Sequence, residues 1–259
     1  MIRALYSSAT GMVSQQTNLD VIANNLANVN TSGFKKSKIE FQDLIYQSSK
    51  LPGSEVGGGN QVPTGIQIGH GSRVMATSKI FTVGDVSHTG SQLDVAIDGQ
   101  GFFEIVMPDG SSAYTRDGAF KLDNTGRLVT SDGMPFQGGV TIPPGTNEIN
   151  IAPTGEISAR TSSGIQTFNM NLVRFTNPAG LESVGRNLYR ETPASGAAQQ
   201  GQPGADGFGV LAQNYLEMSN VKVVEEMVNM IVAQRAYEVN SKAVQTADDM
   251  LQISNNLKR

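Results

Sequence analysis

The sequence predicts an α+β fold in which long N- and C-terminal helices pair as a coiled-coil layer and enclose a central antiparallel β-rich domain. Apolar residues repeat at heptad spacing near both termini, and short β-prone runs separated by turn signals fill the middle. We expect residues 1–34 and 215–259 to form the terminal-helix domain. We expect residues 35–80 to form an extended linker or β-hairpin region, and residues 81–214 to form a β-rich outer domain.

The N-terminal helix is predicted from apolar residues in alternating steps of three and four, with one polar break. These positions are Ile2, Leu5, Ala9, Met12, Gln16, Leu19, Ala23 and Leu26. We expect a helix over about residues 2 to 31. It ends near Gly33, because glycine accepts the left-handed conformation that commonly terminates helices.

A second heptad pattern predicts the C-terminal helix. Its positions are Val232, Ala236, Val239, Ala243, Thr246, Met250, Ile253 and Leu257. Ser219 and Asn220 are candidate N-caps, and Glu225 and Glu226 suit the positive end of the helix dipole. A helix this long needs partners for its apolar stripe, either the N-terminal helix of the same chain or helices of neighbouring copies.

The middle of the chain carries short runs rich in β-branched and aromatic residues. Asp-Gly dipeptides at 98–99, 109–110, 117–118 and 132–133 favour tight hairpin turns, so we expect an antiparallel meander or a small barrel-like domain. Two Gly-rich stretches, residues 50–71 and 196–209, are expected to be loops or linkers.

The composition argues against several classes of function. Only 16% of the 259 residues are charged, and the net charge of −4 gives no basic field for nucleic acid. Cysteine is absent, which excludes disulfides, thiolate catalysis and sulfur-ligated metals. No apolar run is long enough for a membrane helix, and we expect neither membrane insertion nor a cleaved signal peptide.

Candidate catalytic groups are few. His70 and His88 are the only histidines, lie in Gly-rich surroundings and lack metal-ligand spacing. Gly99-Gln-Gly101 runs on into a predicted strand, whereas a dinucleotide loop must open a helix. The prediction is therefore a protein that is not an enzyme and has no catalytic residues, no metal site and no cofactor.

Two polar groups within the predicted helices allow more than one interpretation. Asn24, Asn25 and Asn28 fit a fraying helix end, or buried amides that set the register of packed helices. Arg235 and Tyr237 fit a solvated face, or an interface of the residue types enriched at protein contacts.

Motifs at both ends and in the middle resemble one known family. The segments are Ala23-Asn-Asn-Leu-Ala-Asn-Val-Asn-Thr-Ser-Gly-Phe-Lys35, Ala113-Tyr-Thr-Arg-Asp-Gly118 and Gln234-Arg-Ala-Tyr-Glu-Val-Asn-Ser-Lys-Ala243. Shorter matches include Asp94-Val-Ala-Ile97, Gly101-Phe-Phe103 and Ser219-Asn-Val. Together they resemble the bacterial flagellar rod and hook protein family, and they cover most of the chain.

The resemblance implies a structural subunit that polymerises into a hollow helical tube and transmits torque. The chain length and the segment 46–64 favour the distal rod over the hook. Implied partners are further copies of the chain, the proximal rod and hook-side axial proteins, the P and L rings and the flagellar export apparatus. The implied location is the basal body, where the rod spans the periplasm. The expected assembly residues are Leu5, Met12, Leu19, Asn24, Asn25, Leu26, Asn28, Val232, Arg235, Ala236, Tyr237, Val239, Ala243, Met250, Ile253 and Leu257.

Two other functions remain open at this point. The first is another, proximal rod subunit of the same family. The second, of a different class, is a secreted periplasmic β-domain that binds or cleaves cell-wall glycan, because any two of the 23 carboxylates could converge into an acid–base pair.

Overall fold

The computed structural model describes residues 2–53, 63–161 and 164–256. The chain divides into two compact units. The first, the helical unit, comprises residues 1–26, 37–78 and 223–259. The second, the β unit, comprises residues 27–36 and 79–222. The helical unit therefore combines segments from both ends of the chain with an early insertion.

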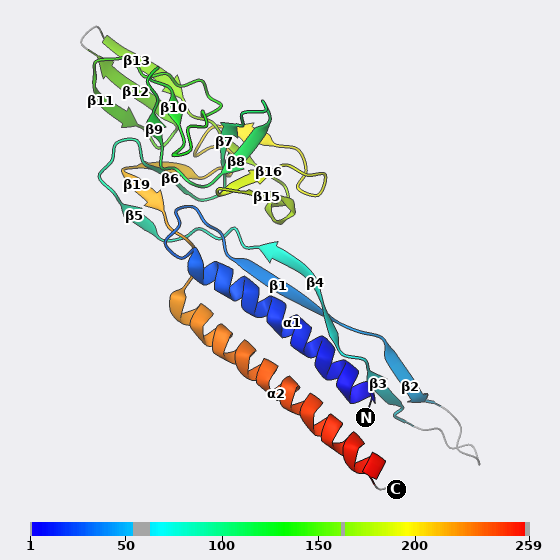
Figure 1. Cartoon of the computed structure of the whole chain (residues 1–259). Coiled ribbons are helices and arrows are strands. Elements are labelled where there is room, and N and C mark those ends of the chain that lie inside the picture. The colour runs from blue at the N-terminus through cyan, green and yellow to red at the C-terminus, as the bar shows by residue number, and fades with distance from the viewer. Residues whose placement is uncertain (1, 54–62, 162–163, 257–259) are drawn as a thin grey trace. The chain divides into compact units, whose positions relative to one another are not determined.

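Two antiparallel helices dominate the helical unit (Figure 1). They are α1 (Ile2–Ala27) and α2 (Val223–Asn256). Asn25 Nδ2 donates to Glu226 Oε2 at 3.3 Å, and a Cβ on Gly11 would lie 3.0 Å from Asn240 Nδ2. The residue numbers in both contacts add to 251, so one antiparallel register holds from Gly11 to Asn25.

Two strand pairs complete the helical unit. The strands are β1 (Ser37–Asp43), β2 (Tyr46–Lys50), β3 (Ile66–Gly69) and β4 (Ser72–Lys79). β1 pairs with β4, and β2 pairs with β3 in antiparallel register. Ser14 Oγ donates to the carbonyl of Ser72 at 3.4 Å, so α1 contacts β4 as well as α2.

The β unit contains short strands in small sheets. They are β5 (Val86–His88), β6 (Val95–Asp98), β7 (Phe103–Val106), β8 (Ser112–Thr115), β9 (Lys121–Leu122), β10 (Leu128–Val129), β11 (Thr146–Ile151), β12 (Glu156–Thr161), β13 (Gly164–Asn169), β14 (Leu172–Arg174), β15 (Glu182–Gly185), β16 (Leu188–Arg190), β17 (Gln199–Gly201), β18 (Val210–Gln213) and β19 (Tyr215–Glu217). A short 3₁₀ helix covers Pro178–Gly180. The largest sheet has the order β15-β16-β8-β7.

Two hydrophobic clusters hold the β unit together. The larger is centred on Ile97, Phe103 and Ile105, which are fully buried. The smaller is mainly aromatic and includes Phe102, Phe175 and Tyr189, whose rings meet edge to face. Such edge-to-face contacts are the geometry that aromatic quadrupoles prefer. The described central region is thus an antiparallel β-rich body, as the α+β prediction requires.

Both helices are shorter than predicted. α1 ends at Ala27 instead of near residue 31, because Thr31 bonds back to the backbone and side chain of Asn28 and closes a turn. α2 begins at Val223 instead of at Ser219 or Asn220. The Asn220 amide bonds elsewhere: it accepts from the backbone N–H of Lys36 at 2.8 Å and donates to the carbonyl of Ile80 at 2.8 Å. Neither described helix is both long and apolar enough to cross a membrane.

The prediction of a simple meander, in which each strand pairs with the next, was wrong for the described strands. Only Asp109-Gly110 connects two neighbouring paired strands, β7 and β8, while Asp132-Gly133 closes the turn from Thr130 to Met134. Asp98-Gly99 lies at the end of β6, whose partner is the distant β18. Asp117-Gly118 joins β8 and β9, which do not pair with each other. A Cβ on Gly118 would lie 1.7 Å from the carbonyl oxygen of Val95, so this glycine allows a close backbone approach.

The two Gly-rich stretches are not entirely loops. Residues 50–71 include β3, and residues 196–209 include β17, which pairs with β14. Gly57-Gly58-Gly59 lies outside the described residues.

Candidate assembly site

α2 has an inner face that repeats at heptad spacing. Its residues are buried or partly buried: Glu226, Met230, Ala233, Asn240, Val244, Ala247 and Leu251. Ala236 and Ser241 beside this face are partly buried too. This face lies one position after the predicted stripe. Its small alanines, Ala233 and Ala247, leave room for the close approach of α1 that Gly11 and Asn240 also show. The pair within the chain therefore uses a different face from the one that the apolar pattern marks.

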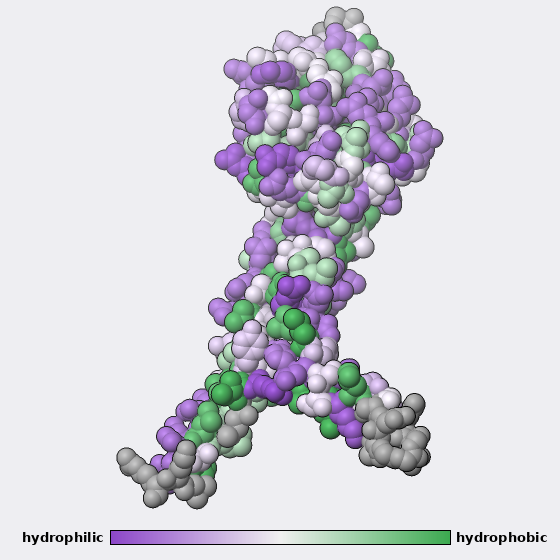
Figure 2. Space-filling view, turned by 90° about the vertical axis from the view of Figure 1, so that its right-hand side faces the viewer, coloured by the Kyte–Doolittle hydropathy of each residue, from purple (hydrophilic) through white to green (hydrophobic). Residues whose placement is uncertain are grey.

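The predicted stripe of α2 is largely exposed within the chain. Val232, Val239, Met250 and Ile253 are between 48% and 66% exposed. Ala243 is exposed too, Ala236 is partly buried, and Leu257 lies outside the described residues. We call the exposed residues Val228, Val232, Val239, Ala243, Met250 and Ile253 the α2 outer seam. Figure 2 shows hydrophobic side chains on the surface of this unit.

α1 also has an exposed row. Ile2, Tyr6, Ala9 and Val13 are exposed at heptad spacing, and we call them the α1 outer seam. The expected assembly residues Leu5, Met12, Leu19 and Leu26 are instead partly buried. They lie beside the face of α1 that contacts α2 and β4.

The three asparagines differ in their surroundings. Asn25 is buried, and its side chain makes a two-way bond to residue 37 of β1: Nδ2 donates to the Ser37 carbonyl at 2.9 Å, and Oδ1 accepts from the Ser37 N–H at 2.9 Å. The same Nδ2 donates to Glu226. Asn25 thus joins α1, β1 and α2. Asn24 is exposed, and Asn28 is partly buried in the turn after α1.

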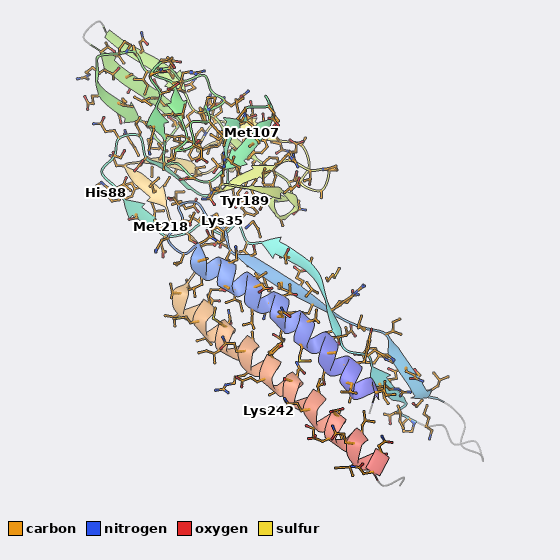
Figure 3. The ribbon with its side chains drawn as sticks, in the orientation of Figure 1. Lys35, His88, Met107, Tyr189, Met218 and Lys242 are labelled. Carbon is orange, nitrogen blue, oxygen red and sulfur yellow. The ribbon has the colours of Figure 1, made fainter. Side chains whose placement is uncertain are left out.

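Arg235 and Tyr237 lie on or near the solvated side of α2. Arg235 Nη1 donates to Glu238 Oε2 at 2.7 Å along the helix, and both side chains are exposed. Tyr237 is 40% exposed. Figure 3 shows Lys242 on the side of α2 away from α1, which is consistent with a polar flank.

A buried ionic cluster in the β unit was not predicted as a site. It consists of Lys35, Arg116 and Glu217, all almost completely buried. Lys35 Nζ donates to Glu217 Oε1, and Arg116 Nε donates to Glu217 Oε2 at 2.9 Å. The cluster links the segment after α1, the end of β8 and the last residue of β19.

Backbone groups complete the ionic cluster. Arg116 Nη1 donates to the carbonyls of Gly99 and Gly101 at 2.9 and 2.7 Å, and Lys35 Nζ donates to the carbonyl of Thr82 at 2.7 Å. Glu217 Oε1 also accepts from the N–H of Gly84 at 2.9 Å. Buried charged groups are tolerated when their remaining hydrogen-bond donors and acceptors are satisfied in this way.

Burial changes the pKa of Lys35 in the cluster. It lowers the pKa of Lys35 below 10.5; attraction to Glu217 acts in the opposite direction, and repulsion from Arg116 adds to the lowering. Burial also raises the pKa of nearby Tyr189. Figure 3 shows Lys35 and Tyr189 within the β unit. Two cations share one carboxylate, so the cluster carries excess positive charge.

Gly33 allows the N-terminal segment to reach the cluster. Its φ is +67°, and a Cβ there would lie 2.6 Å from the backbone nitrogen of Asp117. Its N–H donates to the carbonyl of Glu217 at 2.8 Å. The glycine predicted to end the first helix therefore also packs the chain against β8 and β19.

Three family profiles match the chain. The profile described as flagella basal body rod protein matches residues 5–35, flagellar hook protein FlgE/F/G D1 domain matches 96–159, and flagellar basal body rod FlgEFG protein C-terminal matches 212–257. Each matched range contributes one residue of the ionic cluster: Lys35, Arg116 and Glu217 respectively.

Full-length relatives agree with the profiles. The chain is 50% identical to the flagellar basal-body rod protein FlgG of Borreliella burgdorferi, with all of both chains covered. It is 45% identical to the FlgG of Caulobacter vibrioides, over 99% of this chain and 100% of the relative. It is 44% identical to the FlgG of Bacillus subtilis, with both chains fully covered. The chain belongs to the family of flagellar basal-body rod proteins, which are structural proteins of the flagellum.

Proposed function

We propose that this chain is a structural subunit of the distal flagellar rod, which polymerises into a hollow helical tube and transmits torque from the motor to the hook. The observation that carries the proposal is the pair of outer seams, which stay exposed after α1 and α2 have paired with each other. Family membership supports the wider assignment to the rod.

The outer seams suit contacts between copies. Isolated apolar side chains are common on protein surfaces, but apolar residues repeated at heptad spacing along a helix favour packing against another helix. Val232, Val239 and Met250 lie on one such row. In the proposed tube, neighbouring copies cover these rows, and the terminal helices form a coiled-coil inner layer with the β unit outside it.

The expected assembly residues take different roles in this proposal. Residues of the α2 outer seam contact neighbouring copies directly. Partly buried Leu5, Met12, Leu19 and Leu26 support the packing of α1, and Asn25 sets the register of the helix pair. Arg235 and Tyr237 lie beside the seam, where an interface rim would form.

The proposed partners are further copies of the chain, the adjoining proximal rod and hook-side axial proteins, the surrounding P and L rings and the flagellar export apparatus. The proposed location is the periplasm-spanning rod, reached by export without a cleaved signal peptide. The division into a terminal-helix domain, a linker region and an outer β-rich domain is proposed for the assembled subunit.

Charge insertion on the outer seam tests the proposal. Val239→Asp places a carboxylate on a side chain that is 66% exposed, so the subunit should fold but fail to polymerise. Gln245→Asp is the matched control, because Gln245 is exposed on the polar flank of α2. Rod assembly is measured by electron microscopy of isolated basal bodies, with purified protein compared by circular dichroism.

The expected result is a truncated rod with Val239→Asp and a normal rod with Gln245→Asp. Leu26→Asp should also block assembly, with some loss of helix stability because Leu26 is partly buried. Normal rods from the Val239→Asp subunit would show that the outer seam is not an assembly contact.

A further inference from the structure

The β unit contains a pocket with aromatic walls, which we call the aromatic pocket. Its volume is about 170 Å³, and Phe81, Phe102, Phe175 and Pro178 form its apolar walls. A cavity of ~150 Å³ with apolar walls holds a benzene molecule. The space therefore suits one ring-sized apolar group.

The rings that form the walls already pack against one another before any ligand binds. The rings of Phe81 and Phe102 meet edge to face at 5.3 Å, and those of Phe102 and Phe175 at 5.8 Å. Phe81 also contacts Tyr189 at 5.2 Å. Because this network already fixes the rings, a ligand need not order them, which lowers the entropic cost of binding.

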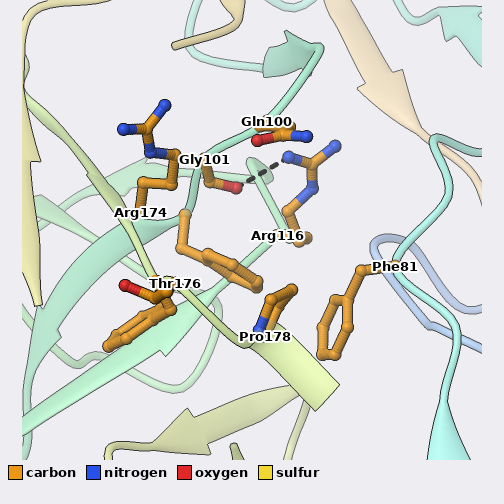
Figure 4. Close-up of a pocket in the computed structure, with 9 residues that line it drawn as sticks. Phe81, Gln100, Gly101, Arg116, Arg174, Thr176 and Pro178 are labelled. Atoms are coloured by element: carbon orange, nitrogen blue, oxygen red, sulfur yellow. Dashed lines mark hydrogen bonds between the residues drawn. The ribbon is translucent and has the colours of Figure 1, made fainter. Parts of the chain in front are cut away.

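Cationic groups line the same pocket. Arg116 and Arg174 both contribute to its surface, and none of the described residues that line it is acidic. Figure 4 shows Arg174, Gln100 and Arg116 along one side of the pocket and Thr176, Pro178 and Phe81 along the other. Positive charge next to an apolar cavity favours a ligand with an anionic end.

The positive charge at the pocket is only partly neutralised. Arg116 shares the single carboxylate of Glu217 with Lys35. Arg174 makes no ion pair within the described part of the chain. Its Nη1 donates to the backbone carbonyl of Asp206 at 3.0 Å, its Nη2 donates to Gln199 Oε1 at 3.5 Å, and its guanidinium lies 5.2 Å from the centre of the Phe208 ring. An arginine that bonds only neutral oxygens retains attraction for a carboxylate.

Uncommitted polar side chains lie beside these cations. Gln100 and Thr176 line the pocket and are exposed, and their side chains bond to no other described residue. A few such groups around an apolar cavity are typical of sites that orient a small ligand. One face of the Phe102 ring already contacts a cation, because Arg116 Cζ lies over it at 6.0 Å from the ring centre.

We propose that the aromatic pocket binds a carboxylate attached to a ring-sized apolar body. Arg174 holds the carboxylate, the aromatic walls hold the apolar body, and Gln100 and Thr176 orient it. A free aromatic acid and the C-terminal carboxylate of a peptide that ends in an aromatic residue share this chemistry. A cationic ligand of the same shape is repelled by Arg116 and Arg174 and binds more weakly.

Titration of the full chain with matched small molecules tests the proposal. Phenylacetate supplies the carboxylate, 2-phenylethanol is a neutral analogue, and phenethylamine is a cationic analogue. Binding is followed by NMR shifts of the backbone amides of Gly101, Phe102 and Thr176. We expect phenylacetate to bind with a Kd on the order of millimolar, as for a small fragment, and at least ~10-fold more tightly than either analogue.

Arginine variants locate the site. Arg174→Gln should weaken phenylacetate binding about 10-fold or more, because it removes a charge-assisted bond. Arg160→Gln, on β12, is the matched control and should leave binding unchanged. Thermal unfolding checks that both variants remain folded. Equal binding of phenethylamine, shifts confined to other residues, or equal weakening by both variants would overturn the proposal.

A peptide comparison distinguishes the two ligand sources. Short peptides ending in phenylalanine are compared with a free or an amidated C-terminus. Tighter binding of the free-acid peptide than of phenylacetate assigns the pocket to a protein chain end. Equal or weaker binding assigns it to a free aromatic acid. Failure of every carboxylate to bind overturns the proposal.

Discussion

Removing the charge of Glu217 tests whether the ionic cluster stabilises the β unit. Glu217→Gln preserves the shape of the side chain but leaves Lys35 and Arg116 without a counter-ion. One carboxylate oxygen also becomes an NH₂ group, which then faces a donor of Lys35 or Arg116. The substitution therefore replaces attraction with donor–donor conflict inside the unit.

The expected loss is large. Breaking a buried ion pair by removing one partner costs about 3–5 kcal/mol, and here one carboxylate serves two cations that are at most 3% exposed. That is a large part of the ~5–15 kcal/mol by which domains are stable. Guanidinium unfolding, followed by near-ultraviolet circular dichroism of the buried tyrosines, measures it. Glu182→Gln is the control, since its pair with Arg190 is half exposed and should matter little.

The pH dependence supplies an independent check. Burial holds the folded pKa of Lys35 below 10.5, so charging Lys35 costs folding free energy. This cost is fully present below the folded pKa and disappears above the unfolded pKa. Without Glu217 the folded pKa falls further, so the deficit of Glu217→Gln should shrink as pH rises from neutral toward 10.5. A deficit below about 1 kcal/mol at neutral pH, or one that grows with pH, would refute the reasoning.

Three further substitutions probe other parts of the fold. Asn25→Leu should lower the unfolding free energy by about 2–4 kcal/mol, because two backbone bonds to β1 and the bond to Glu226 are lost; a thermal melt followed by helical circular dichroism measures it, and an unchanged melting temperature would contradict it. Gly11→Ala should be tolerated, because the ~1 kcal/mol gain in helix propensity offsets a small shift of the Asn240 amide, whereas Gly11→Leu should separate the two helices. Cross-linking between α1 and α2 should therefore be weaker in Gly11→Leu than in Gly11→Ala. Equal cross-linking of the two variants would count against close packing of the helices at Gly11. Burial raises the pKa of Asp117 above 3.8, with Asp94 and Asp132 adding to the rise, so the carboxylate destabilises the fold above its folded pKa and not below its unfolded pKa. Asp117→Asn should therefore be more stable than the natural chain at neutral pH, and this difference in unfolding free energy should vanish in acid. Urea unfolding at both pH values measures it, and a difference that persists in acid would contradict the prediction.

The terminal helices were predictable because their apolar residues repeat locally. The pattern at Val232, Val239 and Met250 identified α2 and its outer seam, since these side chains are large and apolar. The inner face of α2 was not predictable. Glu226, Asn240 and the small Ala233 and Ala247 alternate there with Met230, Val244 and Leu251, so this face has a weaker hydrophobic pattern than the outer seam.

The ionic cluster could not be derived from local sequence. Arg116 and Glu217 are separated by 101 residues, and Lys35 and Glu217 by 182. No residue spacing or periodicity connects positions this distant. The available signal was weaker: Lys35 and Arg116 both fall within motifs shared with the family, but those motifs do not reveal which carboxylate they meet.

The register of α1 and α2 makes the two ends of the helix pair unlike. Continuing the register that joins Asn25 to Glu226 places Ile2 beside Asp249. At the end of the pair where α1 finishes, the Asn25 side chain joins α1 to β1 and α2. At the other end, residues 250–256 of α2 extend beyond the first residue of α1 and include exposed Ile253. A subunit whose two ends differ in this way is polar. Copies added through such ends would all point the same way, which is a requirement for a filament that grows from one tip.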